Sequence, residues 1–364
     1  MVKVLLTGKP FSVSLVPSEP ANVVAGGSGF IASRILDILI EKGYDVVTTV
    51  RSAQSGNKIL ERYPKLSQDR LQYVVVEDIT NVNSLTLILT KMCDYQALQS
   101  SNRPFDGVIH TAAPFTQTFS DPVKEMLDPA IKGTTAVLKA VKQSAPSVKR
   151  VVLTSSFIAM FNPQVAVYDG TSWNPVTRDE AVQNPRFTYS ASKTLAEKAA
   201  WAFIDSEKPS FDLVSINPPL VFGPLRQHIA SLDKVNTSNQ RIRDMVQGKF
   251  SDKLPPTGIH LWVDVRDVAL AHVRALEVPQ AGGNRFLVAA GHMSNKKIAE
   301  AVIATHPELR SRLPAAEQLV DDTPPNVYGF DNAKAVEVLG ITFRSSLREC
   351  VGDTVESLAA VGGI

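Results

Sequence analysis

The chain has 364 residues, 44% of them hydrophobic, which is enough for two domains or for one large α/β domain with an appendage. Its 38 Lys and Arg residues nearly balance its 36 Asp and Glu residues, with no long run of either sign, which argues against binding to nucleic acid or to a membrane surface. Cys93 and Cys350 lack the spacing of a metal site or a disulfide framework, so we expect no bound metal. No stretch approaches the roughly 18 apolar residues of a membrane span, and the first apolar run ends at Lys9, too early for a signal peptide. We therefore expect a cytoplasmic protein.

Two segments near the start are candidates for the first strand of a sheet. Residues 2–8 are apolar and end in glycine, but the glycine-rich turn that should follow begins only at Gly27. We interpret residues 9–26 as an insert, either a retained intron or a natural extension, because its removal would join the first strand to the turn. Alternatively, residues 21–26 supply the strand and keep the spacing between Gly26 and Gly29. The sequence leaves both possibilities open.

After the glycines comes the order of elements that is typical of a dinucleotide-binding unit. Apolar residues recur at helical spacing from 31 to 39, and residues 45–50 form a predicted strand. The N-terminus of such a helix directs backbone N–H groups at a pyrophosphate, and glycines allow its close approach. We expect the turn and the first helical residues to bind the cofactor through Gly26, Gly27, Gly29, Phe30 and Ile31.

A cation stands where the second strand ends. Arg51 occupies this position and Lys58 follows shortly after, with no acidic residue between them. An acidic residue here would bind a ribose diol, whereas a cation suits a 2′-phosphate, so the pattern favours NADP over NAD. The third predicted strand, residues 71–76, leads to Asp78 and Ile79, which we expect beside the adenine.

Strands and helices continue to alternate as far as about residue 160, which indicates a doubly wound parallel sheet. A fourth strand begins at residue 108 and leads into a turn of small residues that contains Ala112. A helix over residues 126–142 and a strand over 150–153 follow, and Ser156 stands just beyond that strand. Ligands of such sheets bind at the carboxyl ends of the strands. We therefore expect Ala112 to contact the cofactor and Ser156 to face the ligand.

Tyr189 and Lys193 are four residues apart in a segment for which we predict a helix that continues over residues 191–207. Residues at this spacing share one helix face. A nearby ammonium favours phenolate and lowers the pKa of a tyrosine from its usual value of about 10. Tyr189 would then exchange a proton with a carbonyl oxygen while hydride moves to or from the carbon.

The carboxyl half of the chain loses this alternation after about residue 225. We assign residues 1–210 to an NADP-binding domain and residues 211–364 mainly to a substrate-binding domain. Strands near 212–217 and 285–288 return from the second domain to the first sheet. Pro218 directs the chain away from the sheet and would place Val221 beside a nicotinamide ring.

These motifs together resemble the extended short-chain dehydrogenase/reductases. The resemblance is greatest to fungal NADPH-dependent aldehyde and methylglyoxal reductases, which are akin to plant dihydroflavonol and cinnamoyl-CoA reductases. It covers nearly the whole chain outside residues 9–26. The motifs that carry it lie at residues 27–32, 50–52, 110–115, 151–156, 172–175, 189–193, 217–218 and 263–269.

The resemblance implies an extended Rossmann fold, α/β with a doubly wound parallel sheet, and a smaller mixed C-terminal substrate domain. It also implies that Tyr189 is the acid/base, that Lys193 binds the ribose and that Ser156 orients the carbonyl. By the same comparison Arg51 meets the 2′-phosphate. Further cofactor contacts fall on Pro218, Val221 and Ser238, and a hydrophobic substrate pocket on Phe115, Phe157 and Phe161.

The expected function is that of an NADPH-dependent carbonyl reductase, a monomer or homodimer, acting on a small or aryl aldehyde or ketone. Lys132 occupies the helix position where many relatives have a catalytic Asn, which leaves the proton relay open. One alternative is an NAD-dependent nucleotide-sugar epimerase or dehydratase. Another is a non-catalytic dinucleotide-binding protein that the N-terminal insert has disabled.

Overall fold

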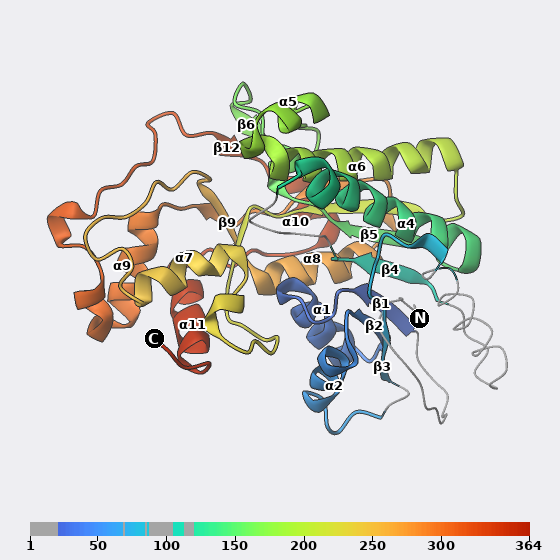
Figure 1. Ribbon diagram of the computed structural model, residues 1–364, viewed down its shortest axis with the longest axis horizontal. Coiled ribbons are helices and arrows are strands. Elements are labelled where there is room, and N and C mark those ends of the chain that lie inside the picture. Colours follow the sequence, from blue (N-terminus) through green and yellow to red (C-terminus); the bar gives the residue numbers. More distant parts are fainter. Residues whose placement is uncertain (1–20, 68–69, 84–85, 87–104, 113–119) are drawn as a thin grey trace.

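A parallel sheet of seven strands forms the centre of the molecule (Figure 1). The computed structural model describes residues 21–67, 70–83, 86, 105–112 and 120–364. The strands lie in the order β10 (Arg285–Leu287), β7 (Asp212–Asn217), β5 (Arg150–Thr154), β4 (Gly107–His110), β1 (Ala21–Ala25), β2 (Asp45–Val50) and β3 (Leu71–Val75). Strands such as β2 and β7 are buried over nearly their whole length, as expected for a parallel sheet covered on both faces.

The first strand of the sheet is β1, the later of the two candidate segments. It pairs in parallel with β2 on one side and with β4 on the other. Residues 21–26, which the insert interpretation includes, therefore form a central strand and the turn after it. The competing segment, residues 2–8, and residues 9–20 lie outside the described residues.

The strand order reverses between β1 and β4, which creates the usual ligand crevice of a doubly wound sheet. From β1 the chain proceeds to β2 and β3 on one side and then returns to β4, β5, β7 and β10 on the other. The turns after β1 and β4 meet at the crevice, because a Cβ atom on Gly26 would lie 3.3 Å from Thr111 Oγ1 and 3.4 Å from Ala112 Cβ.

Helices cover both faces of the sheet (Figure 1). On one face α1 (Phe30–Glu41) packs against α8 (Val265–Glu277), and on the other α4 (Asp128–Ser144) packs against α6 (Thr188–Glu207). A shorter helix, α2 (Ala53–Glu61), packs beside β2 and β3. The side chains that α1 buries, among them Ile35 and Leu39, recur at helical spacing and join the core of the sheet.

A smaller lobe from the carboxyl part of the chain has its own core. Its three-stranded sheet consists of β11 (Gly291–His292), β9 (Leu261–Asp264) and β8 (Leu220–Phe222). Trp262 on β9 is buried among side chains of α7 (Thr237–Val246), α9 (Asn295–Thr305) and α11 (Leu347–Ala359). The other elements are β6 (Val167–Tyr168), β12 (Gly329–Phe330), α5 (Arg178–Gln183), α10 (Ala333–Leu339), a π-helical turn (Val123–Leu127) and short 3-10 turns at Phe157–Ala159, Pro185–Phe187, Leu232–Lys234, Pro279–Ala281, Pro307–Arg312 and Ala316–Gln318.

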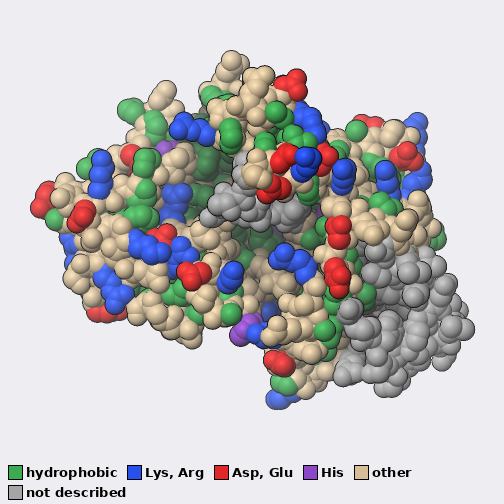
Figure 2. Space-filling view, in the orientation of Figure 1, with side chains coloured by type: hydrophobic (Ala, Val, Ile, Leu, Met, Phe, Trp, Pro, Cys, Tyr) green, Lys and Arg blue, Asp and Glu red, His purple; other side chains and the backbone are tan. Residues whose placement is uncertain are grey.

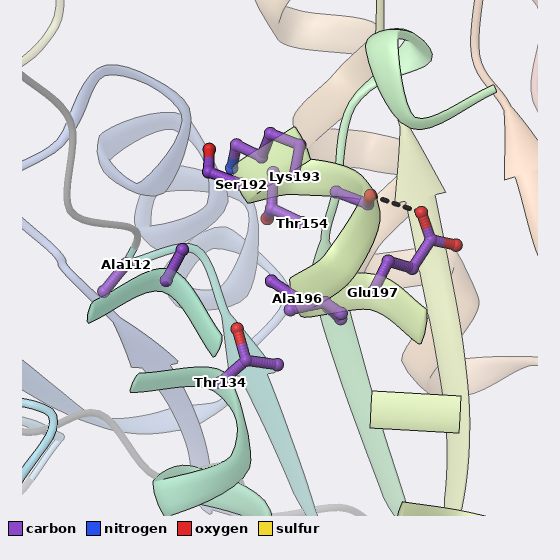
Figure 3. A pocket seen from close by; sticks show the side chains of 10 residues that line it. Ala112, Thr134, Thr154, Ser192, Lys193, Ala196 and Glu197 are labelled. Atoms are coloured by element: carbon purple, nitrogen blue, oxygen red, sulfur yellow. Dashed lines mark hydrogen bonds between the residues drawn. The ribbon is translucent and has the colours of Figure 1, made fainter. Parts of the chain in front are cut away.

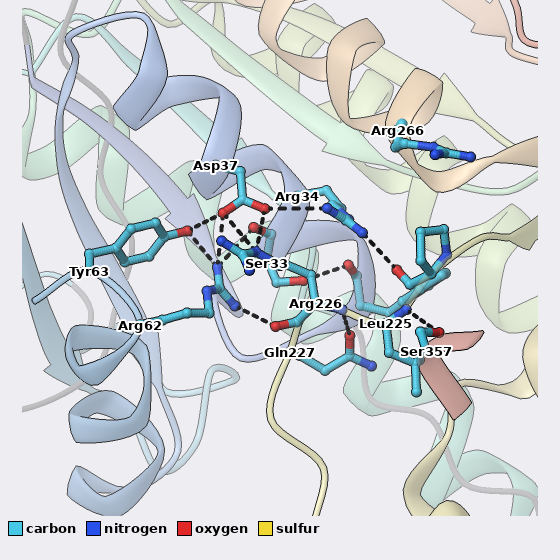
Figure 4. Close-up of polar contacts among 12 residues, drawn as sticks. Ser33, Arg34, Asp37, Arg62, Tyr63, Leu225, Arg226, Gln227, Arg266 and Ser357 are labelled. Atoms are coloured by element: carbon cyan, nitrogen blue, oxygen red, sulfur yellow. Dashed lines mark hydrogen bonds and ion pairs between the residues drawn. The ribbon is translucent and has the colours of Figure 1, made fainter. Parts of the chain in front are cut away.

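A polar cluster fastens the loop after β8 to the helices of the larger lobe (Figure 4). Asp37 on α1 accepts hydrogen bonds from Tyr63 Oη at 2.6 Å and from Arg226 Nε at 3.0 Å. Arg34, also on α1, donates to the carbonyl oxygen of Pro224 at 3.1 Å. These contacts tie the loop after β8 to α1.

On the face shown in Figure 2, basic and acidic side chains are interspersed. This arrangement agrees with the near balance of the two signs in the sequence. Among the described residues, no helix combines the length and the apolar character that crossing a membrane requires.

Gly26 adopts a backbone conformation that other residues rarely accept, with φ at +83°. We expect Gly26→Ala to lower the free energy of unfolding by about 1–2 kcal/mol, because a left-handed conformation costs an L-residue about that much. Urea denaturation measures this change. Ser28→Ala, an exposed position in the same turn, is the control. Equal stability of Gly26→Ala and the wild type would contradict the positive φ.

Candidate active site

A pocket opens at the carboxyl ends of β4 and β5, between α4 and α6 (Figure 3). Lys193 enters it from α6, Thr134 from α4 and Thr154 from the end of β5. The lining residues are Ala112, Ala130, Thr134, Leu153, Thr154, Ser155, Ser192, Lys193, Ala196 and Glu197. Ala112 and Lys193 are therefore together at the crevice.

Ser156 and Tyr189 meet beside this pocket. Both Tyr189 and Lys193 belong to α6, at the spacing that puts them on one face. Ser156 follows β5 and caps a 3-10 turn, where its Oγ accepts a hydrogen bond from the Ile158 N–H at 3.2 Å. Ser156 also makes a side-chain hydrogen bond with Tyr189. The hydroxyl groups of a serine and a tyrosine thus converge next to a lysine.

The pKa of Tyr189 shifts in the direction opposite to the one expected from the sequence. Burial raises the pKa of the phenol above its usual value, and the hydrogen bond with Ser156 counteracts this rise only in part. The expectation rested on the charge of Lys193, whereas desolvation dominates in this structure. Because Tyr189 is 38% exposed, solvent limits the size of the rise. The phenol is consequently protonated at neutral pH.

Lys193 lies in surroundings that disfavour its charge. Burial lowers the pKa of its ammonium group to about 8, and the carboxylate of Glu197 opposes this shift. His110, at the end of β4, is buried, and both of its ring nitrogens lack hydrogen-bond partners within the described residues. Burial, and secondarily the charge of Lys193, lower the pKa of His110 to about 4, so this histidine is neutral. Its position fits a packed residue at a strand end.

The glycine-rich turn fits a bound pyrophosphate. A Cβ atom on Gly29 would lie 3.1 Å from the carbonyl oxygen of Gly26, so the two glycines keep this turn tight. Gly29 is the N-cap of α1 and offers no capping side chain, which leaves N–H groups of the first turn available to an anion. Phe30 is buried and Ile31 is half-buried at the start of the helix.

The two cations predicted at the 2′-phosphate site have different surroundings. Arg51 is exposed directly after β2 and forms no ion pair within the part of the chain that the structure describes. Lys58 lies in the last turn of α2, and its Nζ is 2.6 Å from Nε2 of His228 in the loop after β8. Asp78, after β3, accepts hydrogen bonds from the N–H and hydroxyl groups of Thr80. Of the two cations, Arg51 is thus the one whose side chain has no hydrogen-bond or ion-pair partner among the described residues.

The other predicted cofactor contacts lie beyond β7. Val221 on β8 donates its backbone N–H to Ser238 Oγ at 3.1 Å, so these two positions are joined. The carbonyl oxygen of Pro218 accepts a hydrogen bond from the N–H of Phe157 at 2.8 Å. The segment after β7 is therefore anchored to the turn that follows Ser156.

Ile79, predicted to lie beside the adenine, is half-buried next to α4. Its Cγ2 would lie 3.3 Å from a Cβ atom on Gly133.

Phe157 and Phe161 belong to an aromatic cluster that also includes Tyr168 and Tyr328. The ring of Phe157 lies 4.9 Å from that of Tyr168 and 5.8 Å from that of Tyr328, measured between centroids. Phe157 is 1% exposed, whereas Phe161 is half-buried. Phe115 lies outside the described residues. Nothing in the sequence indicated the two tyrosines, because they come together only through the pairing of β6 with β12.

Lys132 does not face the pocket. The residues of α4 that line it are Ala130 and Thr134, and Lys132 is separated from each by two positions, about 200° around an α-helix. Its Nζ instead pairs with Asp128 at 3.1 Å on the surface. Thr134 is thus the polar residue that this helix presents to Lys193.

Sequence reasoning also missed Glu197, which lines the pocket and is 1% exposed. Its spacing was the available signal, since it follows Lys193 by four residues as Lys193 follows Tyr189. Metal-ligating groups give no further candidates: among the described residues, no cluster of His, Cys, Asp or Glu is fit to hold a metal ion.

The doubly wound sheet, the glycine turn and the Ser–Tyr–Lys group define the class of dinucleotide-binding proteins with a Rossmann-like fold. The chain belongs to the NAD dependent epimerase/dehydratase family, whose model matches residues 22–289. It is 50% identical over 339 residues to ketoreductase azaE of Aspergillus niger, covering 92% of this chain and 96% of that protein. It is 36% identical over 351 residues to the putative NADPH-dependent methylglyoxal reductase GRP2 of Candida albicans, covering 93% and 99%. A crystal structure of Gre2 from Candida albicans with NADPH has a TM-score of 0.83 at 31% identity, covering 94% of this chain and 99% of that one. These findings confirm the resemblance to the extended short-chain dehydrogenase/reductases.

Proposed function

We propose that this chain is an NADPH-dependent carbonyl reductase that acts on small or aryl aldehydes and ketones. The observation that carries the proposal is the hydrogen bond between Ser156 and Tyr189 beside Lys193, at the carboxyl edge of the sheet. The relatives at 50% and 36% identity, a ketoreductase and a putative NADPH-dependent methylglyoxal reductase, support the same reaction class.

Tyr189, Ser156 and Lys193 have separate roles in the reduction of the carbonyl group. NADPH, when bound, supplies the hydride. The phenol of Tyr189 donates its proton to the carbonyl oxygen, and its raised pKa keeps that proton available at neutral pH. Ser156 donates a hydrogen bond to the same oxygen as negative charge develops on it. Lys193 holds the cofactor ribose with its ammonium group.

Binding of NADPH rests on two separate features of the chain. The turn at Gly26, Gly27 and Gly29 and the uncapped start of α1 receive the pyrophosphate. Arg51, exposed and without an ion-pair partner among the described residues, receives the 2′-phosphate. Val221 and Ser238 lie at the nicotinamide end.

The substrate pocket lies on the aromatic side of Ser156. Phe157 directly follows the serine but is buried, so Phe161, half-buried in the same segment, is the ring that would face a substrate. Aromatic walls select substrates mainly by hydrophobicity and shape, which suits small and aryl carbonyl compounds. Figure 2 shows a recess with hydrophobic side chains between the smaller lobe and the elements above it.

The test is a steady-state assay of the purified chain with NADPH and three carbonyl compounds: methylglyoxal, an aryl aldehyde and an aryl ketone. We expect NADPH consumption that depends on the carbonyl compound and is weaker with NADH. A nucleotide-diphosphate sugar is added in a parallel reaction. Epimerisation of the sugar without net consumption of NADPH, or no binding of NADPH at all, would overturn the proposal.

A further inference from the structure

Glu197 is a buried carboxylate for which the proposed reaction has no direct use. It is 1% exposed and lies on α6 one turn beyond Lys193. Tyr189, Lys193 and Glu197 follow one another at intervals of four residues and so lie along one face of the helix. A buried charge is costly unless it is paired and hydrogen-bonded, so its surroundings explain why it is tolerated there.

Donors from several strands surround the carboxylate. Oε2 accepts hydrogen bonds from Ser155 Oγ at 2.5 Å and from Asn217 Nδ2 at 2.8 Å. Oε1 accepts from Arg285 Nε at 2.6 Å and from Ser215 Oγ at 2.8 Å. These donors belong to β7, to β10 and to the end of β5, so a single side chain fastens α6 to three strands.

Two of these contacts lead directly to Ser156. Ser155 is its neighbour in the chain, and its hydroxyl donates to Glu197 Oε2. Asn217 Nδ2 also donates to the carbonyl oxygen of Ser156 at 3.2 Å. Glu197 therefore sets the position of the Ser156 backbone relative to the helix that carries Tyr189 and Lys193.

The charge of Glu197 also affects the ionisation of Lys193. Among the described residues that line the pocket, Glu197 is the only carboxylate, and its charge opposes the loss of the Lys193 proton. The other titratable groups around Lys193 are Tyr189 on α6, protonated at neutral pH, and the neutral His110 on β4. From α4 the pocket receives only the uncharged Ala130 and Thr134.

On the side of α8, one of the pocket residues contacts a neutral histidine. Thr154 Oγ1 lies 2.6 Å from Nε2 of His272, whose Nδ1 is 2.7 Å from the carbonyl oxygen of Val268. Burial lowers the pKa of His272 to about 4, so it carries no charge near Lys193 at neutral pH. Arg285, on β10, carries a further charge, and it is paired with Glu197.

We propose that Glu197 is a positioning residue of the active site, which holds Ser156 in register with Tyr189 and keeps Lys193 in its ammonium form. This inference rests on the carbonyl reductase function proposed above. It assigns no step of the reaction to Glu197 itself.

The test measures the ionisation of Lys193 without cofactor. The protein is treated with an amine-acylating reagent across a pH series, and acylation of the Lys193 peptide is quantified by mass spectrometry. We expect a midpoint near pH 8 in the wild type. In Glu197→Gln the midpoint should fall by about one pH unit, because the opposite charge one helical turn away is removed. At pH 8 this shift lowers the ammonium fraction about fivefold, and the affinity for NADPH should fall with it.

Glu197→Gln leaves Arg285 buried without its partner and is therefore at risk of not folding. The double variant E197Q/R285M removes both charges, and because the positive charge of Arg285 itself disfavours the Lys193 ammonium, its midpoint is compared with that of Arg285→Met. Asp267→Asn is the matched control, because Asp267 is another buried carboxylate, 1% exposed, paired with Arg344 away from the pocket. Equal Lys193 midpoints in E197Q/R285M and Arg285→Met would overturn the electrostatic role.

Activity then tests the placement of Ser156. In assays with NADPH, E197Q/R285M should lower kcat at pH 6.5, where Lys193 is charged, by at least about tenfold, and Glu197→Asp should recover part of the loss. An unchanged kcat would overturn the placement of Ser156. If the wild type reduces no carbonyl compound while the midpoint still shifts, the proposed function fails and the charge effect of Glu197 stands.

Discussion

Replacing Tyr189 by Phe is expected to lower kcat for carbonyl reduction by about 10²–10⁴-fold, the usual contribution of a general acid. The phenylalanine keeps the ring on α6 but has no proton to give to the developing alkoxide, and Ser156 loses one of its hydrogen-bond partners. Binding of NADPH should change by less than about threefold, because Lys193 and the glycine turn are untouched. Steady-state kinetics and a fluorescence titration with NADPH measure the two effects separately.

Tyr44→Phe is the matched control for this variant. It removes a phenol that hydrogen-bonds to Glu277 at 3.0 Å, on a loop far from the pocket. Its kcat should stay close to that of the wild type. Activity of Tyr189→Phe within a factor of ten of the wild type would remove Tyr189 from its proposed role.

Replacing Arg51 by Ala is expected to weaken the binding of NADPH by about 10–150-fold, while the Kd for NADH stays within about twofold. A hydrogen bond to a charged group contributes about 1.5–3 kcal/mol, and each 1.4 kcal/mol changes an equilibrium constant about tenfold. NADH lacks the 2′-phosphate, so its affinity should not depend on Arg51. Fluorescence titration of both cofactors gives the ratio of affinities directly.

Arg70→Ala controls for the loss of an arginine next to β2. Arg70 pairs with Asp45 at 2.9 Å, at the end of the strand opposite to Arg51. Its removal should leave both affinities unchanged. An equal loss of NADH and NADPH binding in Arg51→Ala would show that Arg51 supports the fold of the site rather than the recognition of phosphate.

The buried strands were the part of the fold most open to prediction from sequence. Residues 45–50 and 212–217 are strands with the predicted bounds, because the first ends at the charged Arg51 and the second at Pro218. The helix predicted over 191–207 begins three residues earlier, at Thr188, after the 3-10 turn Pro185–Phe187. Helix starts without a capping side chain give the sequence no signal.

The site was predictable where local spacing encodes it. Tyr189 and Lys193 share a helix face for this reason, and the strand end before Ser156 identifies the ligand side. The upward shift of the Tyr189 pKa was not predictable, because it depends on desolvation in the folded chain, which residue spacing does not show. The same holds for the Glu197 network, whose donors come from three separate strands.

The first strand could be identified only from the pairing of strands in the sheet. Two apolar segments compete for one position, and only the pairing of β1 with β2 and β4 identifies residues 21–25. The orientation of Lys132 also depended on the structure, since the family comparison fixes a place in the chain but not the face of the helix.

The most direct test of the central claim is to follow the transferred hydrogen itself. The wild-type chain is incubated with an aryl aldehyde and with each of the two NADPH stereoisomers deuterated at C4 of the nicotinamide, and the alcohol product is analysed by mass spectrometry. We expect one deuterium on the carbinol carbon of the product from one stereoisomer and none from the other. Recovery of unreduced aldehyde from both reactions, although NADPH is bound, would contradict the assignment of this chain as a carbonyl reductase.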